Sequence, residues 1–139
     1  MQTLPKITIG VGVVVWRGED VLLIRRARPP FLGHWSIPGG RLEPGETLHE
    51  CALRELREET NTHADLIDLI NVYESISSDS HYVMVDYVAY WKKGEPVPAD
   101  DAMDAQFFDY DTACEKLSWD KTRLALRESR VILEKHQKK

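Results

Sequence analysis

The feature that most constrains this chain is one amphipathic helix, predicted directly after a glycine-rich turn. Residues 39–61 read GGRLEPGETLHECALRELREETN. Thr47 and Glu50 have the spacing of a capping box, so we expect the helix to begin there and to end near Thr60. Asn61 can adopt the left-handed conformation that ends many helices. The helical period places Leu48, Ala52, Leu53 and Leu56 on one apolar face. Glu58, Glu55 and Glu59 form a patch that runs from the wet face onto the edge of the apolar one, and Glu59 falls between Leu48 and Ala52.

The three glutamates raise a question, because carboxylates repel one another. Arg54 lies four residues from both Glu50 and Glu58, and such pairs are ordinary on a solvated helix. Glu55 and Glu59, however, form a like-charge pair at the same spacing, which destabilises a helix by about a few tenths of a kcal/mol. A divalent cation reverses this repulsion, and carboxylate oxygens suit Mg²⁺ or Mn²⁺ better than zinc. The spacing alone leaves both a solvated acidic helix and a metal site open.

Apolar, β-branched segments predict strands before and after the helix. A chain of 139 residues fits one domain, residues 1–139. The strands do not alternate regularly with helices, so we expect an α/β domain with a mixed β-sheet sandwiched between helices. The expected strands are residues 7–16, 21–28, 66–77, 81–91 and 105–110, the third and fourth paired through a turn, and the further helices are residues 111–117 and 122–136.

Composition excludes several classes of protein. A formal net charge of -5 argues against nucleic acid as the main partner. The first residues lack the pattern of a signal peptide, and the longest apolar runs are too short to span a bilayer, so we expect neither secretion nor a membrane partner. Cys51 and Cys114 lie far apart in predicted helices and suggest no disulfide framework. We therefore expect a cytoplasmic protein.

The glutamates belong to a longer pattern, which runs from Gly40 through Glu46 to the segment RELREE at residues 54–59. This pattern resembles the signature of the Nudix hydrolases, and it fixes several residue types at exact intervals. The likeness departs at the end, where Asn61 and Thr62 replace the usual glycine and aliphatic residue. Two flanking segments, residues 25–47 and 81–108, resemble the small, single-domain, ADP-ribose pyrophosphatase-like group of that family.

The resemblance implies an enzyme that hydrolyses a nucleoside diphosphate linked to another moiety. It implies Mg²⁺ as cofactor, with Mn²⁺ as a substitute, because charge on a diphosphate must be neutralised during attack by water. By the same resemblance Glu55, Glu58 and Glu59 are the metal ligands, together with the backbone carbonyl of Gly40. Arg54 would hold a catalytic carboxylate in place.

The resemblance leaves the general base open between a signature glutamate and an acid of a later loop. That loop, residues 92–104, offers Glu95, Asp100, Asp101 and Asp104, of which we choose Asp101. Each of these acids also fits a solvated loop. Glu46 is expected to have a supporting role near the helix.

Residues near the glycines are candidates for binding the substrate. Arg25, Arg26 and Arg28 leave a predicted strand in a basic run, and one of them can clamp a phosphate, although such runs are also common at solvated strand ends. Of the three we choose Arg25 and Arg28. Trp35 can stack on a base or ribose, or belong to the core. Gly39 adjoins the expected metal site and completes this set.

These residues lead to three functional hypotheses. The first is hydrolysis of ADP-ribose or a related nucleotide sugar to a nucleoside monophosphate and a phosphorylated product. The second keeps the mechanism and changes the substrate to a (d)NTP, as in cleansing of the nucleotide pool. The third is a non-catalytic ligand sensor, which the intact signature disfavours. The expected partner is a small-molecule nucleotide, and the resemblance also allows a homodimer.

Overall fold

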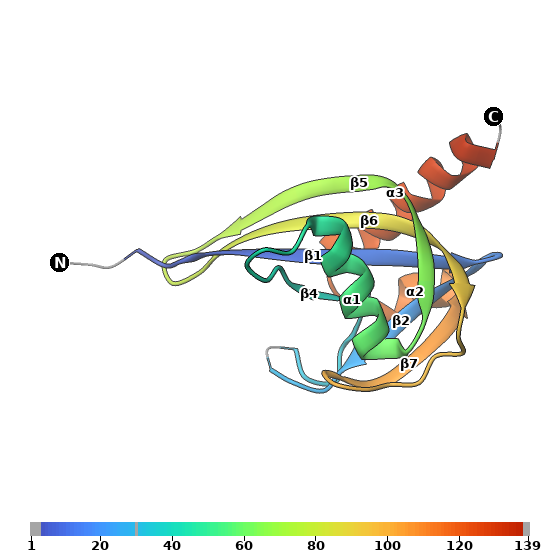
Figure 1. Ribbon diagram of the computed structural model, residues 1–139, viewed down its shortest axis with the longest axis horizontal. Helices are drawn as coiled ribbons and strands as arrows, with labels where there is room; N and C mark the ends of the chain where they lie inside the picture. Colours follow the sequence, from blue (N-terminus) through green and yellow to red (C-terminus); the bar gives the residue numbers. More distant parts are fainter. Residues whose placement is uncertain (1–3, 30, 138–139) are drawn as a thin grey trace.

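The computed structural model describes residues 4–29 and 31–137 (Figure 1). The remaining residues of the expected domain, 1–3, 30 and 138–139, lie outside the described part. In chain order the elements are β1 (Ile7–Arg17), β2 (Asp20–Arg26), β3 (Trp35–Ser36), β4 (Gly39–Arg41), α1 (Leu48–Thr60), β5 (His63–Ile76), β6 (His81–Lys93), β7 (Ala102–Asp109), α2 (Tyr110–Lys116) and α3 (Asp120–Gln137). Each predicted helix and strand is present, with ends that differ by a few residues. The short strands β3 and β4 were not predicted.

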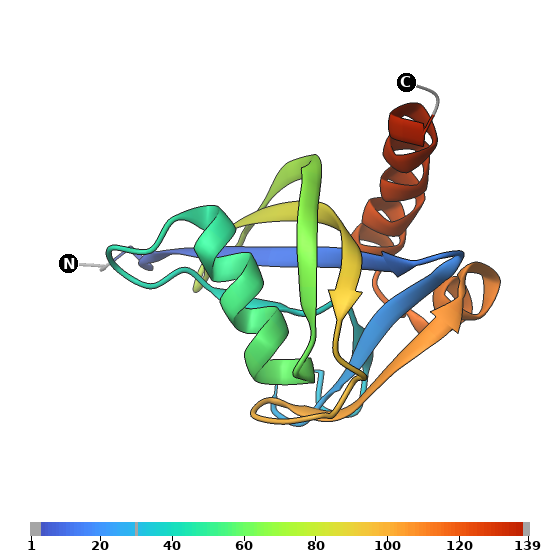
Figure 2. The ribbon, with the colours of Figure 1, turned by 45° about the vertical axis from the view of Figure 1, so that its right-hand side comes forward.

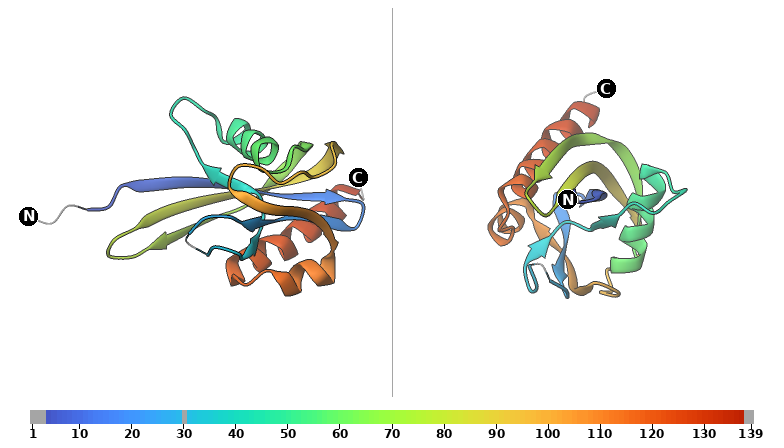
Figure 3. Two further views of the ribbon diagram at one scale, coloured as in Figure 1. Left: turned by 90° about the horizontal axis from the view of Figure 1, so that it is seen from below. Right: turned by 90° about the vertical axis from the view of Figure 1, so that its left-hand side faces the viewer.

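The strands form a mixed sheet in the order β3-β2-β1-β6-β5, with β4 paired to β1 and β7 paired to β2. β1 is the central strand and runs parallel to β6 from Ile7 to Trp16. Its other edge is shared, because β4 pairs with residues 10–12 and β2 only with residues 16–17. β5 and β6 form the expected antiparallel hairpin. Helix α1 covers one side of the sheet and α2 and α3 the other, which confirms the expected architecture (Figure 3).

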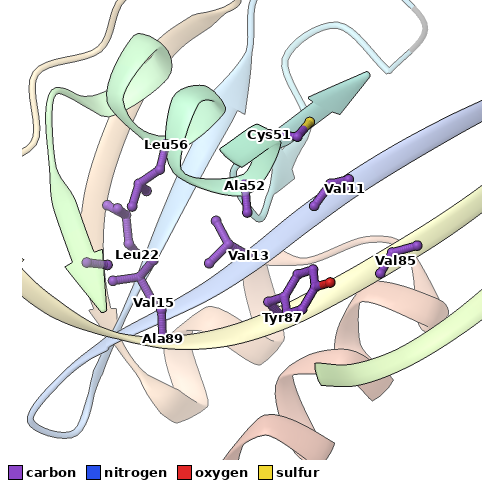
Figure 4. Packing of buried hydrophobic residues seen from close by; sticks show 11 residues of the cluster. Val11, Val13, Val15, Leu22, Cys51, Ala52, Leu56, Val85, Tyr87 and Ala89 are labelled. Atoms are coloured by element: carbon purple, nitrogen blue, oxygen red, sulfur yellow. The ribbon is translucent and has the colours of Figure 1, made fainter. Parts of the chain in front are cut away.

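The continuous apolar run of β1 follows from this arrangement, because residues 10–16 are buried on both faces. Alternate side chains of the strand enter two separate clusters. The cluster between the sheet and α1 includes Val11, Val13, Val15, Ala52 and Leu56 (Figure 4). The cluster beneath α2 and α3 includes Val14, Trp16, Ala113, Leu117 and Leu126.

Helix α1 begins and ends where the sequence predicts. The Thr47 side chain accepts a hydrogen bond from the Glu50 backbone N–H at 3.1 Å, and the Glu50 carboxylate accepts one from the Thr47 N–H at 3.0 Å. Asn61 takes the left-handed conformation, with φ of 58°. Thr62, where the Nudix pattern has an aliphatic residue, is fully buried, and its hydroxyl lies 2.7 Å from that of Thr60. Pairing the two hydroxyls removes much of the expected cost of a polar residue there.

The predicted apolar face of α1 needs one correction. Leu53 is 37% exposed, whereas Glu55 and Glu59 are buried together with Cys51. Glu55 therefore lies within the buried face and not at its edge, next to Glu59, whose place between Leu48 and Ala52 the helical period predicted. The reason is the neighbouring strand β4, whose first two residues are glycines and leave room for carboxylates against the backbone.

The two cysteines are free thiols, as expected. Burial raises the pKa of the Cys51 thiol to about 12, so this residue behaves as core filler. Within residues 4–29 and 31–137, no helix combines the length and the apolar character needed to cross a membrane.

Candidate active site

Arg54 organises the acidic side chains around α1. Its Nε and Nη2 atoms donate to the two carboxylate oxygens of Glu46, at 2.5 and 3.0 Å. Its Nη1 atom donates to Glu55 at 2.7 Å and to Glu58 at 3.2 Å, and Nη2 also donates to the Arg41 carbonyl. The hydrogen bonds from Arg54 hold the pKa of Glu46 at about 2. One guanidinium thus fixes three carboxylates in position.

Glu55 and Glu59 are the buried members of this group, and β4 holds both. The Gly39 N–H donates to Glu59 Oε1 at 2.8 Å, and the carboxylate of Glu55 lies over Gly40, where any Cβ would overlap it. Burial raises the pKa of Glu59 to about 8, and it also raises that of Glu55. Both carboxylates therefore remain costly to ionise, even though Arg54 contacts Glu55 and the charge of Arg26 acts on Glu59.

The acidic loop before β7 is fastened to the last turn of α1. The Ala99 N–H donates to the Glu59 carbonyl at 3.0 Å, and the Val97 N–H donates to the Thr60 carbonyl at 2.8 Å. In Figure 2 this gold segment passes below the C-terminal end of the helix. The charge of Asp100 contributes to the raised pKa of Glu55, and that of Asp101 to the raised pKa of Glu59. Two loop acids are thus near enough to the buried glutamates for their charges to be felt.

The other two acids of the loop point to different partners. Glu95 forms an ion pair with Arg17 at 2.9 Å. Asp104 accepts hydrogen bonds from the Ala105 N–H and from the Gln106 side chain. The structure therefore brings Asp101, our candidate base, toward the glutamates and leaves Glu95 and Asp104 out.

The three arginines after β2 have three different environments. Arg25 Nε donates to the Gly33 carbonyl at 2.9 Å, which supports the loop that follows. Arg28 Nε lies 2.6 Å from Asp101 Oδ1. Arg26, which the sequence analysis did not select, lines a cavity and its charge lowers the pKa of Glu59. A basic run alone could not single out this residue, because its position depends on the pairing of β2.

The cavity beside Arg26 has a volume of about 160 Å³, and half of its lining residues carry aromatic rings. Trp35 lines it and also packs edge-on against Phe108, with ring centroids 5.1 Å apart. It therefore belongs in part to the core, and its stacking on a substrate stays a prediction. Trp119 forms another wall and is 44% exposed. Sequence reasoning missed Trp119, because neither its exposure nor its nearness to Trp35 can be read from the sequence. The lining residues are Arg26, Phe31, His34, Trp35, Ser36, Ser118, Trp119 and Thr122.

Comparison with known proteins identifies the family to which the chain belongs. The family model described as the NUDIX domain matches residues 6–128, which is most of the chain. The chain belongs to the Nudix family. It is therefore a Nudix hydrolase, of the class that acts on pyrophosphate bonds of nucleoside diphosphate derivatives.

Several relatives of this Nudix hydrolase are named. It is 33% identical over 118 residues to the ADP-ribose pyrophosphatase of Methanocaldococcus jannaschii, covering 84% of this chain and 69% of that protein. It is 35% identical to the NAD-capped RNA hydrolase NudC of Pseudomonas aeruginosa, covering 80% of this chain but only 39% of that protein. Among solved structures, the MutT Nudix hydrolase of Burkholderia pseudomallei superposes with a TM-score of 0.75 at 28% identity, covering 88% of this chain and 98% of that one.

Nudix hydrolases generally use divalent metal ions, and the residues here fit such an ion in their chemistry. The donors are carboxylate oxygens, and the buried pair Glu55 and Glu59 lacks a full positive counter-charge of its own. Within the described residues, however, no three His, Cys, Asp or Glu side chains converge as a ready metal site. Arg54 engages Glu55 and Glu58, and Gly39 engages Glu59. Coordination would thus require these side chains to exchange partners.

Proposed function

We propose that this Nudix hydrolase is Mg²⁺-dependent and cleaves the diphosphate of ADP-ribose or a related nucleotide sugar. One observation carries the proposal: Arg26 lines the aromatic cavity and lies near enough to the buried Glu59 for its charge to lower the pKa of that carboxyl. A nucleoside in the cavity would thus extend its diphosphate past Arg26 toward the acids. The similarity to an archaeal ADP-ribose pyrophosphatase supports this choice of substrate.

The acids would hold and position the reacting groups. Glu55, Glu58 and Glu59, with the Gly40 carbonyl, would bind the metal, and Arg54 would keep Glu55 and Glu58 aligned. When bound, Mg²⁺ neutralises charge on the diphosphate oxygens and lowers the pKa of a bound water. Mn²⁺ has the same preference for oxygen ligands and is expected to substitute.

Asp101 is the proposed general base. It would accept a proton from the attacking water while the water oxygen bonds to phosphorus and the bond to the bridging oxygen breaks. ADP-ribose and water would then give AMP and ribose 5-phosphate. The loop that carries Asp101 is tied to the backbone of Glu59 and Thr60, so the carboxylate stays close to the metal-binding residues.

The substrate contacts follow from the cavity. Its volume of about 160 Å³ suits one planar base, which Trp35 and Trp119 could sandwich or border. Arg25 remains a proposed phosphate contact, as does Gly39, although the Gly39 N–H is already bonded to Glu59. Arg28, the other candidate from the sequence, is already paired with Asp101. We also propose that small nucleotides are the partners, and not nucleic acid or membranes. The free thiols suit a cytoplasmic location, and light scattering would test a homodimer.

A panel of nucleotides tests the substrate. Purified protein with Mg²⁺ is given ADP-ribose, other nucleotide sugars, NADH and (d)NTPs, and the nucleoside monophosphate formed from each is separated and quantified by chromatography. We expect the highest kcat/KM with ADP-ribose or a nucleotide sugar. A (d)NTP in first place would support the nucleotide-pool alternative. Tight ADP-ribose binding without turnover of any compound would support the sensor.

A further inference from the structure

The ion pair between Arg28 and Asp101 joins two separate loops. The Nε–Oδ1 distance is 2.6 Å, and that oxygen is shielded from solvent although the contact lacks hydrogen-bond geometry. A backbone bond reinforces the junction, because the Ala27 N–H donates to the Asp101 carbonyl at 2.8 Å. In Figures 1 and 2 the light-blue segment after β2 lies beside the orange segment before β7.

The loop that carries Arg28 also forms a wall of the aromatic cavity. Phe31 and His34 belong to this loop and line the cavity. Two backbone bonds close the loop at its base, from the Arg26 N–H to the His34 carbonyl at 2.9 Å and from the Gly33 N–H to the Arg26 carbonyl at 2.8 Å. Arg28 therefore belongs to the same closed loop as the cavity wall, while its guanidinium contacts the loop of Asp101.

The ion pair between Arg28 and Asp101 is better suited to orienting a side chain than to stabilising the protein. The side chains of Arg28 and Asp101 are 69% and 45% exposed, and such ion pairs contribute little to stability. The backbone already fixes the main chain of Asp101. What Arg28 adds is the direction of the Asp101 side chain.

We propose that Arg28 is a positioning residue that aims the Asp101 carboxylate at the attacking water. This inference rests on the proposed function, in which Asp101 is the base. It reassigns Arg28 from phosphate clamp to the partner of a catalytic acid. The cavity loop and the base are then coupled, because any movement of the loop on substrate binding also moves Arg28.

A double-mutant cycle tests the proposal with Arg28→Gln, Asp101→Asn and the combined variant, assayed for kcat and KM on the best substrate. We expect Asp101→Asn to lower kcat by about 10²- to 10⁴-fold. Arg28→Gln should lower kcat by about 10- to 100-fold, with KM changed less than about twofold. The combined variant should be no slower than Asp101→Asn alone, because Arg28 acts only through Asp101. Arg28→Lys should restore part of kcat.

Arg17→Gln is the matched control, because Arg17 pairs with Glu95 at the start of the same loop but away from the glutamates. It should leave kcat and KM close to those of the native protein. A rise in KM at constant kcat for Arg28→Gln, or losses that add in the combined variant, would show a phosphate clamp and overturn the proposal.

An unchanged kcat for Asp101→Asn would also overturn it. The hydrolase assignment would survive that result if Glu58→Gln still abolished turnover, so the two failures are distinguishable.

Discussion

Both faces of the sheet bury carboxylates, but the hydrogen-bond partners of these carboxylates differ between the two faces. On the α1 face, Glu55 and Glu59 accept hydrogen bonds from Arg54 and from the Gly39 N–H. On the α3 face, Asp86 of β6 is 1% exposed, and its Oδ2 has no hydrogen-bond partner in the described part of the chain. Burial raises the pKa of Asp86 to about 7. A raised pKa is thus common to both faces, whereas an organised set of donors and acids is found on one.

The surroundings explain the difference. The carboxylate of Asp86 occupies the space above Gly12, against the side chain of Ile37. No basic residue contributes to its pKa, and burial is its one cause. Glu59, in contrast, is influenced by Arg26, Glu55 and Asp101. Several groups around a buried acid indicate a site more clearly than burial alone.

The largest effect is expected on the α1 face, from Glu58→Gln. If Glu58 is a metal ligand, as we propose, removing its charge should lower kcat by at least about 10²-fold, with the unfolding midpoint unchanged because Glu58 is exposed. Glu115→Gln, an exposed acid on α2, is the matched control and should keep full activity. Turnover at the native rate would rule out Glu58 as part of the catalytic site.

Arg54→Met sharpens the comparison by making the α1 face resemble the α3 face. It leaves the carboxylates of Glu46 and Glu55 without their shared partner, and we expect a loss of about 2 to 4 kcal/mol of unfolding free energy. Millimolar Mg²⁺ should recover part of the loss and EDTA should remove the recovery, because the cation binds the folded state. Chemical denaturation measures both, with the exposed Arg57→Met as control. Equal stability with and without Mg²⁺ would contradict metal binding here.

Asp86→Asn tests the isolated acid through its pH dependence. The Asp86 carboxyl has a higher pKa in the folded than in the unfolded chain, so it lowers the unfolding free energy as the pH rises. This destabilisation is absent below pH about 4, grows as the carboxyl ionises in the unfolded chain, and is complete above pH about 7. Asparagine stays neutral throughout. The variant should therefore gain about 2 to 3 kcal/mol relative to the native protein between pH 5 and 8. Asp65→Asn, an exposed acid on β5, should show no such trend in urea titrations.

The smallest expected effect concerns the start of α1. Thr47→Ala removes the side-chain acceptor of the capping box and should lower the unfolding free energy by about 1 kcal/mol. Thr47→Ser keeps the acceptor and should remain near the native value. Urea denaturation at neutral pH separates the two, and equal losses would mean that the methyl group of Thr47 is what matters.

The sequence predicted best the features that depend on neighbouring residues. The cap at Thr47, the turn at Asn61 and the spacing of the glutamates are all local, and each could be read from a short segment. β3 and β4 are only two and three residues long, too short to show a strand pattern, and exist because β1 and β2 pair with them.

The site residues that were missed depend on contacts between distant segments. Trp119 reaches the cavity from the beginning of α3, and Arg26 faces it through the pairing of β2. The burial of Glu55 at the centre of a helix face was hidden because hydrophobic periodicity treats every acid as solvent-facing. Only the glycines of β4 reveal why such a position is tolerated.

The pairing of β1 with β6 also bears on how the chain folds during synthesis. Ile7 pairs with His81, so more than half of the chain must leave the ribosome before the central strand acquires its long parallel partner. Until then β1 exposes an apolar edge that a chaperone or another nascent chain can bind. The β5–β6 hairpin, which is closed by a short turn, would form first and then capture β1, making this late encounter the slow step of folding.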